Sequence, residues 1–533
     1  MHMDERARRI WDRFSLQQRT AFFSCLITGL LVHLYAFTNL IPNADGLSRV
    51  FDPQQMTVSG RWFLHYASAL NNFTQMPAVI GLLSLLWIAL AAALTVELLT
   101  IRSRVLAGLS GAVMAAFPCL GYTFLYMFTA SAYCLAIFLA VLSLWLALRN
   151  NRGWLLATLV LALSMGIYQV YVTVAISLAL LVVFREALDP EANFRSTLTM
   201  GLRLMAYLAW GAVLYYAILL IFLNVKDLEL LSYLGMDAAN SGYPFGQLPS
   251  LIFRSYKQVV AFFFLPGAAD AFCTPWLVLL NLAALAIGAL CCLTRMGAKG
   301  LWKETWRPIG ALAMLALLPL GMNFGQIISP HSAPTPMMKY AFVVVYLAVL
   351  LLADLADGLS SPFALKGKTL CAVPIWAALI LLFSLNTSNL LYTASNQAHR
   401  ATESYATRLL TRIESCPGYE PGMEIAIVGA IPADQIRHSV DSYRQVDHYS
   451  VPKGSLISLN KHIYFYLNDW LNVPVDEPSE ETMKAISDSP EFQAMPLYPA
   501  DGSVQVLDGR VVVRVQEEYT PKSDYEIAYE NRR

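Results

Sequence analysis

The first 389 residues repeat one pattern: an apolar run about as long as a bilayer is thick, followed by a polar loop. A helix needs roughly 20 apolar residues to cross the hydrocarbon core. Residues 154–184 are too long for one crossing and have basic residues at both ends, so we interpret them as two short spans that meet near residues 166–169. The other predicted spans are residues 21–41, 78–101, 105–120, 129–148, 201–223, 272–294, 307–322, 339–357 and 369–389. Only 14% of the residues are charged, against about 25% in soluble domains. The sequence therefore predicts an all-α polytopic membrane protein with about eleven transmembrane helices.

Basic residues gather in alternate loops, and this alternation predicts the orientation. Cytoplasmic loops of membrane proteins carry an excess of Lys and Arg. With a cytoplasmic N-terminus, the inner loops hold most of the basic residues: Arg102, Arg104, Arg149, Arg152, Arg185, Arg195, Arg203, Arg295, Lys299, Lys303, Arg307, Lys366 and Lys368. An odd number of crossings then places the C-terminal part of the chain outside.

The tail differs in composition from the rest of the chain. From Leu390 onward it has 21 acidic and 13 basic residues, so the remaining 16 acidic and 24 basic residues precede it. A helix is predicted over residues 395–415, and strands are predicted over 423–428 and 511–515. We therefore divide the chain into a membrane domain, residues 1–389, and a small α+β domain, residues 390–533.

Three outer segments are longer than connectors need to be: residues 42–77, 224–271 and 323–338. Within the second, residues 247–265 alternate aromatic and aliphatic side chains with basic ones. This pattern is typical of a helix that lies in the membrane interface with its basic side toward the lipid headgroups. The inner loops are short by comparison, so we expect the chemistry on the outer face.

The first outer loop has the strongest candidate for a catalytic group. Asp45 follows the first span closely, with Gly46 beside it to allow a tight turn. Asp52 and Arg61 come a little further on. A carboxylate at the lipid–water boundary is partly desolvated, which raises its pKa and suits a general base. The alternative interpretation is that Asp45 and Asp52 are solvated helix caps.

Three short motifs resemble sequence elements of a known enzyme family. The stretch from His33 through residues 39–45 to Gly60-Arg-Trp resembles the start of the bacterial and phage-encoded O-antigen glucosyltransferases of the glucosyltransferase II type. Residues 166–171, Gly-Ile-Tyr-Gln-Val-Tyr, resemble a second element of that family, and the helical residues 396–414 resemble a third. The resemblance covers most of residues 20–415 and is weak in the extreme C-terminal domain.

The resemblance implies a membrane-embedded glycosyltransferase of the GT-C architecture in the bacterial inner membrane. Its implied donor is undecaprenyl-phosphate glucose, and its implied acceptor is a lipid-linked O-antigen or related surface glycan on the periplasmic face. It also implies inversion at the anomeric carbon, with an acidic residue of the first outer loop as the base. Here that residue is Asp45 first and Asp52 second.

Four outer cations could hold the phosphate that leaves. They are Arg61, Arg254, Lys257 and Lys339. Fixed positive charge stabilises a leaving phosphate, and the planar fork of an arginine can hold two of its oxygens, which favours Arg61 and Arg254. The alternative interpretation for each cation is contact with lipid headgroups.

Further candidates for sugar contacts are polar or aromatic residues. Tyr168 and Gln169 could line a sugar cavity, because a polar residue inside a helix bundle usually has a partner or a substrate; the alternative is helix termination and packing. His65 and His331 could contact sugar or be ordinary surface residues. No metal-ligand cluster, phosphate-cradling glycine loop or dinucleotide fingerprint is present, so we expect no metal and no cofactor. The basic residues follow the predicted topology, which gives nucleic-acid binding no support.

Two other functions fit a polytopic chain of this kind. A transporter or flippase for lipid-linked glycans should carry ionisable residues in mid-span and an internal repeat. We find only Glu97, close to a helix end, and no repeat. A polymerase or ligase of O-antigen would share the outer face but use a diphosphate-linked donor, and such enzymes tend to have several arginines in one large outer loop.

Overall fold

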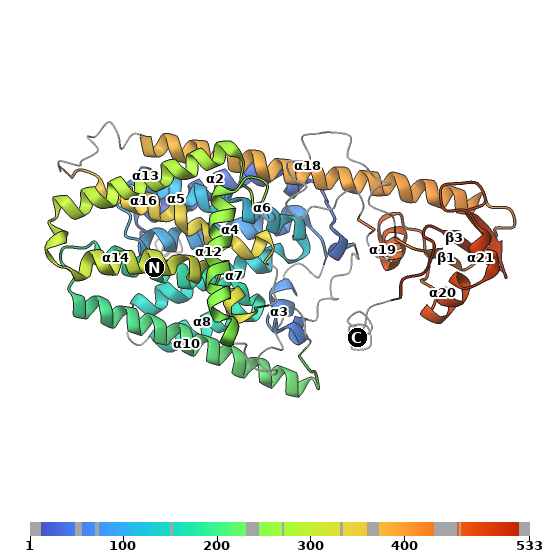
Figure 1. Ribbon diagram of the computed structural model, residues 1–533, viewed down its shortest axis with the longest axis horizontal. Coiled ribbons are helices and arrows are strands. Elements are labelled where there is room, and N and C mark those ends of the chain that lie inside the picture. Colours follow the sequence, from blue (N-terminus) through green and yellow to red (C-terminus); the bar gives the residue numbers. More distant parts are fainter. Residues whose placement is uncertain are drawn as a thin grey trace, which may run out of the picture. The chain divides into compact units, whose positions relative to one another are not determined.

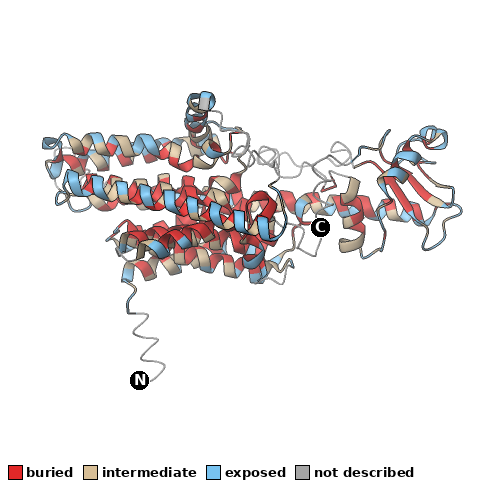
Figure 2. Ribbon diagram, turned by 90° about the horizontal axis from the view of Figure 1, so that it is seen from below, coloured by how far each residue is buried: buried red, intermediate tan, exposed pale blue. Residues whose placement is uncertain are grey.

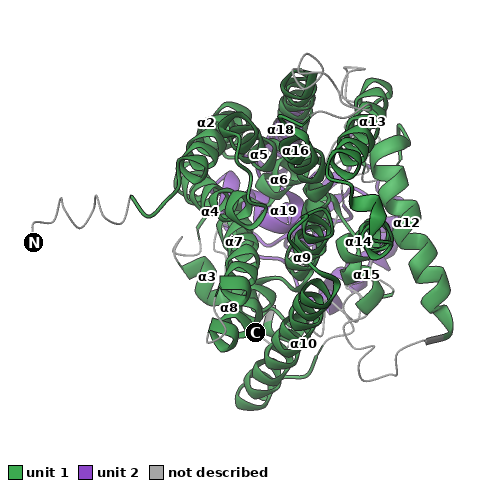
Figure 3. Cartoon of the chain, turned by 90° about the vertical axis from the view of Figure 1, so that its left-hand side faces the viewer, with its two compact units in different colours: residues 1–40, 52–391 green, residues 41–51, 392–533 purple. Residues whose placement is uncertain are grey.

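The computed structural model describes residues 12–47, 56–69, 74–149, 153–230, 245–268, 271–330, 334–359, 372–430, 456–457 and 460–521. The chain forms two compact units, coloured separately in Figure 3. Unit 1 contains residues 1–40 and 52–391, and unit 2 contains residues 41–51 and 392–533. A short piece of the first predicted outer loop therefore belongs with the tail, which the sequence did not indicate.

Unit 1 is a bundle of helices (Figure 1). In chain order these are α2 (Leu16–Thr38), α3 (Leu64–Ser68), α4 (Pro77–Leu98), α5 (Arg104–Ala116), α6 (Pro118–Thr123), α7 (Met127–Arg149), α8 (Trp154–Ile167), α9 (Val172–Ala187), α10 (Phe194–Val225), α12 (Leu248–Phe264), α13 (Pro275–Ala298), α14 (Trp306–Met322), α15 (Phe324–Ile328) and α16 (Val344–Ala356). Short 3-10 turns join several of them: η2 (Met56–Ser59), η4 (Phe124–Tyr126), η6 (Gln169–Tyr171), η7 (Phe245–Gln247), η8 (Leu301–Lys303) and η9 (Pro336–Val343). The last helix, α18 (Ala372–Glu414), begins in unit 1 and belongs to unit 2 from Tyr392 onward.

The described helices fit a membrane protein. Eight segments are long and apolar enough to cross a bilayer, and one of them, Arg104–Arg149, contains α5, α6 and α7 in succession. Two further apolar helices, α8 and α14, are shorter. Figure 2 shows exposed residues along the outward sides of these helices, and many of them are large and apolar, among them Leu31, Leu155 and Trp276. The total of eleven crossings remains a prediction.

The predicted break within residues 154–184 is confirmed. Helix α8 ends at Ile167, Tyr168 has extended backbone angles, and α9 begins at Val172 after η6. The break lies where Gly166 and Gln169 interrupt the apolar run.

The last predicted span, residues 369–389, and the helix predicted separately over residues 395–415 are parts of one helix; the end of the span at residue 389 stays a prediction. Helix α18 continues without interruption for 43 residues, through the helix predicted separately over 395–415. The physical reason is that no glycine or proline occurs between Ile375 and Glu414, so nothing in the local sequence stops the helix.

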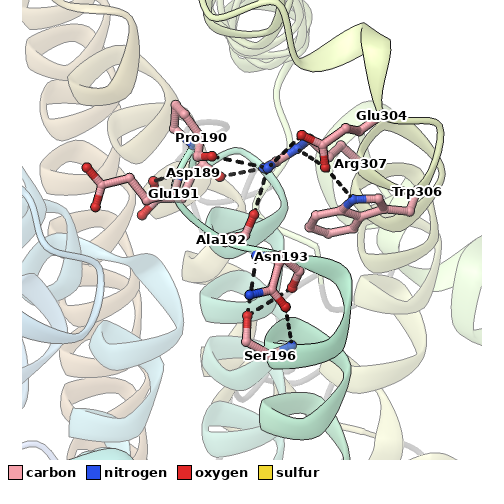
Figure 4. Close-up of polar contacts among 9 residues, drawn as sticks. All are labelled: Asp189, Pro190, Glu191, Ala192, Asn193, Ser196, Glu304, Trp306 and Arg307. Carbon is pink, nitrogen blue, oxygen red and sulfur yellow. Dashed lines mark hydrogen bonds and ion pairs between the residues drawn. The ribbon is translucent and has the colours of Figure 1, made fainter.

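Arg307, a basic residue of a predicted inner loop, binds another loop of unit 1 instead of serving only as a flanking charge. Arg307 is 1% exposed, and its guanidinium donates to the carbonyls of Asp189, Pro190 (3.2 Å) and Ala192 (2.7 Å). Figure 4 shows this side chain pointing from the start of α14 into the loop between α9 and α10. Glu304 pairs with the same guanidinium at 3.2 Å. These bonds supply donors to backbone carbonyls of the loop between α9 and α10.

Helix α12 confirms the helix predicted over residues 247–265. It runs across the other helices of unit 1 in Figures 1 and 3. Its exposed side carries the apolar Phe253 and Val260, and Leu251 and Phe262 are buried against the unit. Its place at a membrane surface remains a prediction.

Unit 2 is a small α+β unit around a three-stranded sheet. The strand order is β1 (Ile425–Val428), β3 (Arg510–Arg514), β2 (Val504–Leu507), with β1 parallel and β2 antiparallel to the central β3. Two of these strands match the predicted ones. The remaining elements are η1 (Ala44–Gly46), α19 (Asn460–Phe465), the π-turn η11 (Tyr466–Trp470), α20 (Glu480–Ser487) and α21 (Pro490–Ala494).

Candidate functional site

In unit 1, a segment of the predicted first outer loop lies against the break between α8 and α9. The backbone N–H of Phe63 donates to the carbonyl of Gly166 at 2.8 Å. The side-chain amide of Gln169 donates to the carbonyl of Ser59 at 2.8 Å. Two of the motifs that the sequence singled out, more than 100 residues apart, are thus joined by direct hydrogen bonds.

Tyr215 of α10 forms hydrogen bonds with both of these segments. Its hydroxyl accepts from Gln169 at 3.0 Å and donates to the carbonyl of Gly60 at 2.9 Å. Gly60 has a φ of +80°, a backbone conformation that side chains other than glycine's rarely adopt. The turn before Arg61 is therefore fixed by its own glycine and by two side chains from other helices.

Arg61 lies on an aromatic cluster. Its guanidinium carbon is 4.4 Å from the centre of the Tyr168 ring, and one guanidinium nitrogen donates to the hydroxyl of Tyr133 at 3.2 Å. Tyr133 and Tyr168 are stacked, with ring centres 4.8 Å apart and planes within 15°, and Tyr171 meets both rings edge-on. The cation–π contact contributes about 0.5–2 kcal/mol. The three tyrosines are buried and Arg61 is half-buried, so the cation is held by the unit and still partly accessible.

Trp62 fixes the backbone next to this cation. Its indole is 4% exposed and is stacked on Phe222 with ring centres 5.5 Å apart. A Cβ placed on Gly166 would be 2.7 Å from the indole, closer than carbon atoms approach without a shift. Glycine at position 166 is therefore what lets the indole pack against the end of α8.

Lys339 is 6% exposed and lies within a long 3-10 turn, η9, which contacts η6 and α6. Its neighbour Tyr340 donates to the carbonyl of Met114 at 2.9 Å. In a continuous helix that carbonyl would accept from residue 118, but Pro118 has no N–H. The burial of this side chain does not suit the alternative interpretation, contact with lipid headgroups; the role of Lys339 as a cation for the leaving phosphate stays a prediction.

Asp45 belongs to unit 2, in the 3-10 turn η1. The backbone N–H of Gly46 donates to the side-chain oxygen of Asn43 at 2.8 Å, so Asn43 is the cap of this turn and Asp45 is not. Gly46 has no positive φ, so the turn does not depend on glycine there. The carboxylate of Asp45 is exposed on the surface of unit 2, and its partial desolvation at the lipid–water boundary stays a prediction.

The structure describes three of the remaining candidates. His65 is exposed on α3, and Arg254 and Lys257 are exposed on α12. One Arg254 nitrogen donates to the carbonyl of Pro330 at 3.3 Å. Two further candidates, Asp52 and His331, lie outside the described residues.

Sequence reasoning missed two residues of the cluster, Tyr133 and Tyr215; Tyr171 entered it only as the last residue of the 166–171 motif. Each interrupts an aliphatic stretch of a predicted span with a hydroxyl-bearing ring. A buried tyrosine hydroxyl usually needs a partner, so this was the available signal. The sequence could not show that the partners would be Arg61, Gln169 and Gly60.

One comparison identifies the chain's relatives. The profile of the family described as glucosyl transferase GtrII matches residues 34–352. This range is more than half of the 533 residues and includes both segments that meet at Arg61 and Tyr168. No curated protein and no solved structure matches the chain.

Proposed function

The chain belongs to the GtrII glucosyltransferase family, and from this premise we propose that it moves a hexose from undecaprenyl-phosphate sugar to an O-antigen or other surface glycan. The transferred sugar is glucose by the family description. The transfer inverts the anomeric carbon and takes place at the periplasmic face of the bacterial inner membrane. The expected resemblance to O-antigen glucosyltransferases is confirmed by the family match; the donor, the acceptor and the side of the membrane belong to the proposal.

The observation that carries the proposal is the placement of Arg61. A guanidinium that lies on a tyrosine ring and donates to a second tyrosine has a fixed orientation. Such a planar cation can hold two oxygens of the leaving phosphate while negative charge develops on that phosphate. The aromatic rings beneath it also offer flat apolar surface to a sugar ring or to the start of a polyprenyl chain.

The proposed base is Asp45, with Asp52 as the second candidate. An inverting transfer needs a base on the acceptor hydroxyl opposite the leaving group. It needs little help from an acid, because a phosphate monoester is a good leaving group. The exposed carboxylate of Asp45, on a hydrogen-bonded turn, suits an acceptor that arrives from water.

The other candidate residues take more specific proposed roles. Gln169 positions the Arg61 turn through Ser59, and Tyr168 supports the guanidinium. His65 remains a proposed sugar contact, as does His331. Arg254 and Lys257 are proposed contacts for anionic lipid headgroups or for the donor phosphate. Lys339 lies in η9, which contacts η6, and its proposed role is to supply positive charge for the leaving phosphate.

Purified full-length protein in proteoliposomes tests the donor. We expect glucose to reach a glycan acceptor from polyprenyl-phosphate glucose and not from UDP-glucose or a polyprenyl-diphosphate sugar. Transfer from the diphosphate donor alone would identify a polymerase or ligase. Movement of the lipid-linked sugar across the bilayer without transfer would identify a flippase and refute the proposal.

A phosphatase reporter fused to the C-terminus of the full chain tests on which side of the membrane unit 2 lies. We expect it to be active, as in the periplasm, while a reporter placed after Arg149 is inactive. The reverse result would remove the periplasmic assignment of unit 2 and of Asp45.

A further inference from the structure

The turn that carries Asp45 is part of the C-terminal unit's own structure. Leu47, two residues further along, has no exposed surface and packs in the hydrophobic core of unit 2 with residues such as Leu409 and Ile427. The indole N–H of Trp470 donates to the carbonyl of Leu47 at 2.8 Å. One side chain and one backbone group therefore fix the chain just after Asp45.

The chain just before Asp45 is fixed as well. Ile41 is 6% exposed, and Asn43 bonds the N–H of Gly46 through both its side-chain oxygen (2.8 Å) and its carbonyl (3.1 Å). Asp45 is the exposed residue between these two anchors. A short turn held at both ends has little freedom to move its carboxylate.

Trp470 is itself held in place by an aromatic group. Its ring lies parallel to that of Tyr466, at 13° and 6.3 Å between centres, and the ring of His399 meets it edge-on at 4.9 Å. The hydroxyl of Tyr466 is 3.2 Å from Nδ1 of His399. Burial raises the pKa of Tyr466, so the phenol keeps its proton and forms a neutral hydrogen bond with the imidazole. Trp470 thus has a defined position from which to bind Leu47.

The local backbone also points to a specialised role. Tyr466 and Trp470 are the first and last residues of a π-turn that follows α19 directly. Single π-turns are rare and occur often at functional sites. Here the turn brings the two rings into parallel contact and directs the indole N–H to the first-loop segment.

We propose that the C-terminal domain holds the catalytic turn, with Trp470 and His399 as positioning residues that determine where the Asp45 carboxylate lies. This inference rests on the proposed role of Asp45 as the base. It gives the tail a task that is different from binding glycan or from general stabilisation.

The test is Trp470→Phe in the full-length protein, which removes the N–H donor and keeps an aromatic ring. We expect faster hydrogen exchange at the backbone amides of Gly46 and Leu47, with unchanged exchange in β1 and β3. We expect kcat to fall by roughly ten- to hundredfold, because small displacements of a catalytic group cost about that much, with KM for the donor unchanged. Tyr466→Phe, which removes only the hydroxyl bond to His399, should shift both readouts in the same direction by less.

Trp376→Phe is the matched control. The Trp376 indole donates to the carbonyl of Leu280 at 2.9 Å within unit 1. The substitution therefore removes the same kind of hydrogen bond at a position outside unit 2. We expect no change in exchange at residues 41–47 and no change in kcat.

The outcomes separate this inference from the proposed function. If Asp45→Asn leaves transfer intact, the proposed role of Asp45 as the base fails and the positioning role fails with it, whatever the exchange at Gly46 shows. If Asp45→Asn abolishes transfer but Trp470→Phe changes neither exchange nor kcat, only the positioning role is overturned. Faster exchange with unchanged kcat would overturn it too, and so would a rise in acceptor KM alone, which would indicate a glycan-binding domain.

Discussion

Replacing Gly166 by alanine should loosen the Arg61 cluster, and the structure gives the size of the effect. The new Cβ would lie 2.7 Å from two carbons of the Trp62 indole. The indole cannot easily move away, because it is buried and stacked on Phe222. Overpacking of this kind typically costs about 1–3 kcal/mol.

A second glycine serves as a control that separates the free-energy cost of the clash from the gain in helix propensity. Gly201 lies in α10, and no atom lies within 4 Å of a Cβ placed on it. Alanine gains about 0.5–1 kcal/mol over glycine in a helix, and both glycines are helical. The difference in stability between Gly166→Ala and Gly201→Ala is therefore the clash alone, about 1–3 kcal/mol.

Thermal unfolding in detergent provides the assay. We expect Gly166→Ala to unfold at a lower temperature than Gly201→Ala and to lose glucose transfer, because Trp62 is bonded directly to Arg61 in the chain. Adding Trp62→Leu to Gly166→Ala should recover part of the lost stability, since the smaller side chain leaves room for the methyl group. Equal unfolding temperatures for the two alanine variants would refute the packing argument.

Two other substitutions test separate parts of the structure. Arg61→Lys keeps the charge, but a lysine cannot lie flat on Tyr168 while it donates to Tyr133, so we expect the rate of glucose transfer to fall by tenfold or more. The control is Arg149→Lys: the guanidinium of Arg149 lies 4.4 Å over Trp145, and its replacement should leave the rate unchanged. Equal rates for the two variants would contradict the role assigned to Arg61. Arg307→Met removes the guanidinium donor from the carbonyls of Asp189, Pro190 and Ala192, which should destabilise unit 1 by about 3 kcal/mol or more. Arg195→Met, at an exposed position, should change stability by less than about 0.5 kcal/mol. Similar unfolding temperatures for the two variants would show that the Arg307 bonds contribute little.

Local sequence was sufficient for the helices and for the break in residues 154–184. The apolar run there exceeds the length of one crossing, and Gly166 and Gln169 mark its weakest point. Continuity of α18 could not be predicted with the same rule, because hydropathy drops after Leu390 while helix propensity does not. The polar residues that end a span do not end a helix.

Long-range pairing explains what the sequence could not give. Arg307 is a flanking charge by position, and only the fold shows that the 189–192 carbonyls surround it. In the same way, nothing local connects Leu47 with Trp470, which are 423 residues apart. The Arg61 cluster was half predictable: two motifs were recognised, but the tyrosines that join them were not.

The central claim is that a first-loop carboxylate, Asp45, is the base of the transfer. The direct measurement is the rate of glucose transfer from polyprenyl-phosphate glucose in membranes that contain Asp45→Asn, Asp52→Asn or the unmodified chain at equal expression. We predict that Asp45→Asn loses nearly all transfer while it still binds the donor, and that Asp52→Asn keeps most of it. Near-normal transfer by Asp45→Asn together with loss in Asp52→Asn would move the base to Asp52, and full transfer by both variants would remove the first loop from the chemistry.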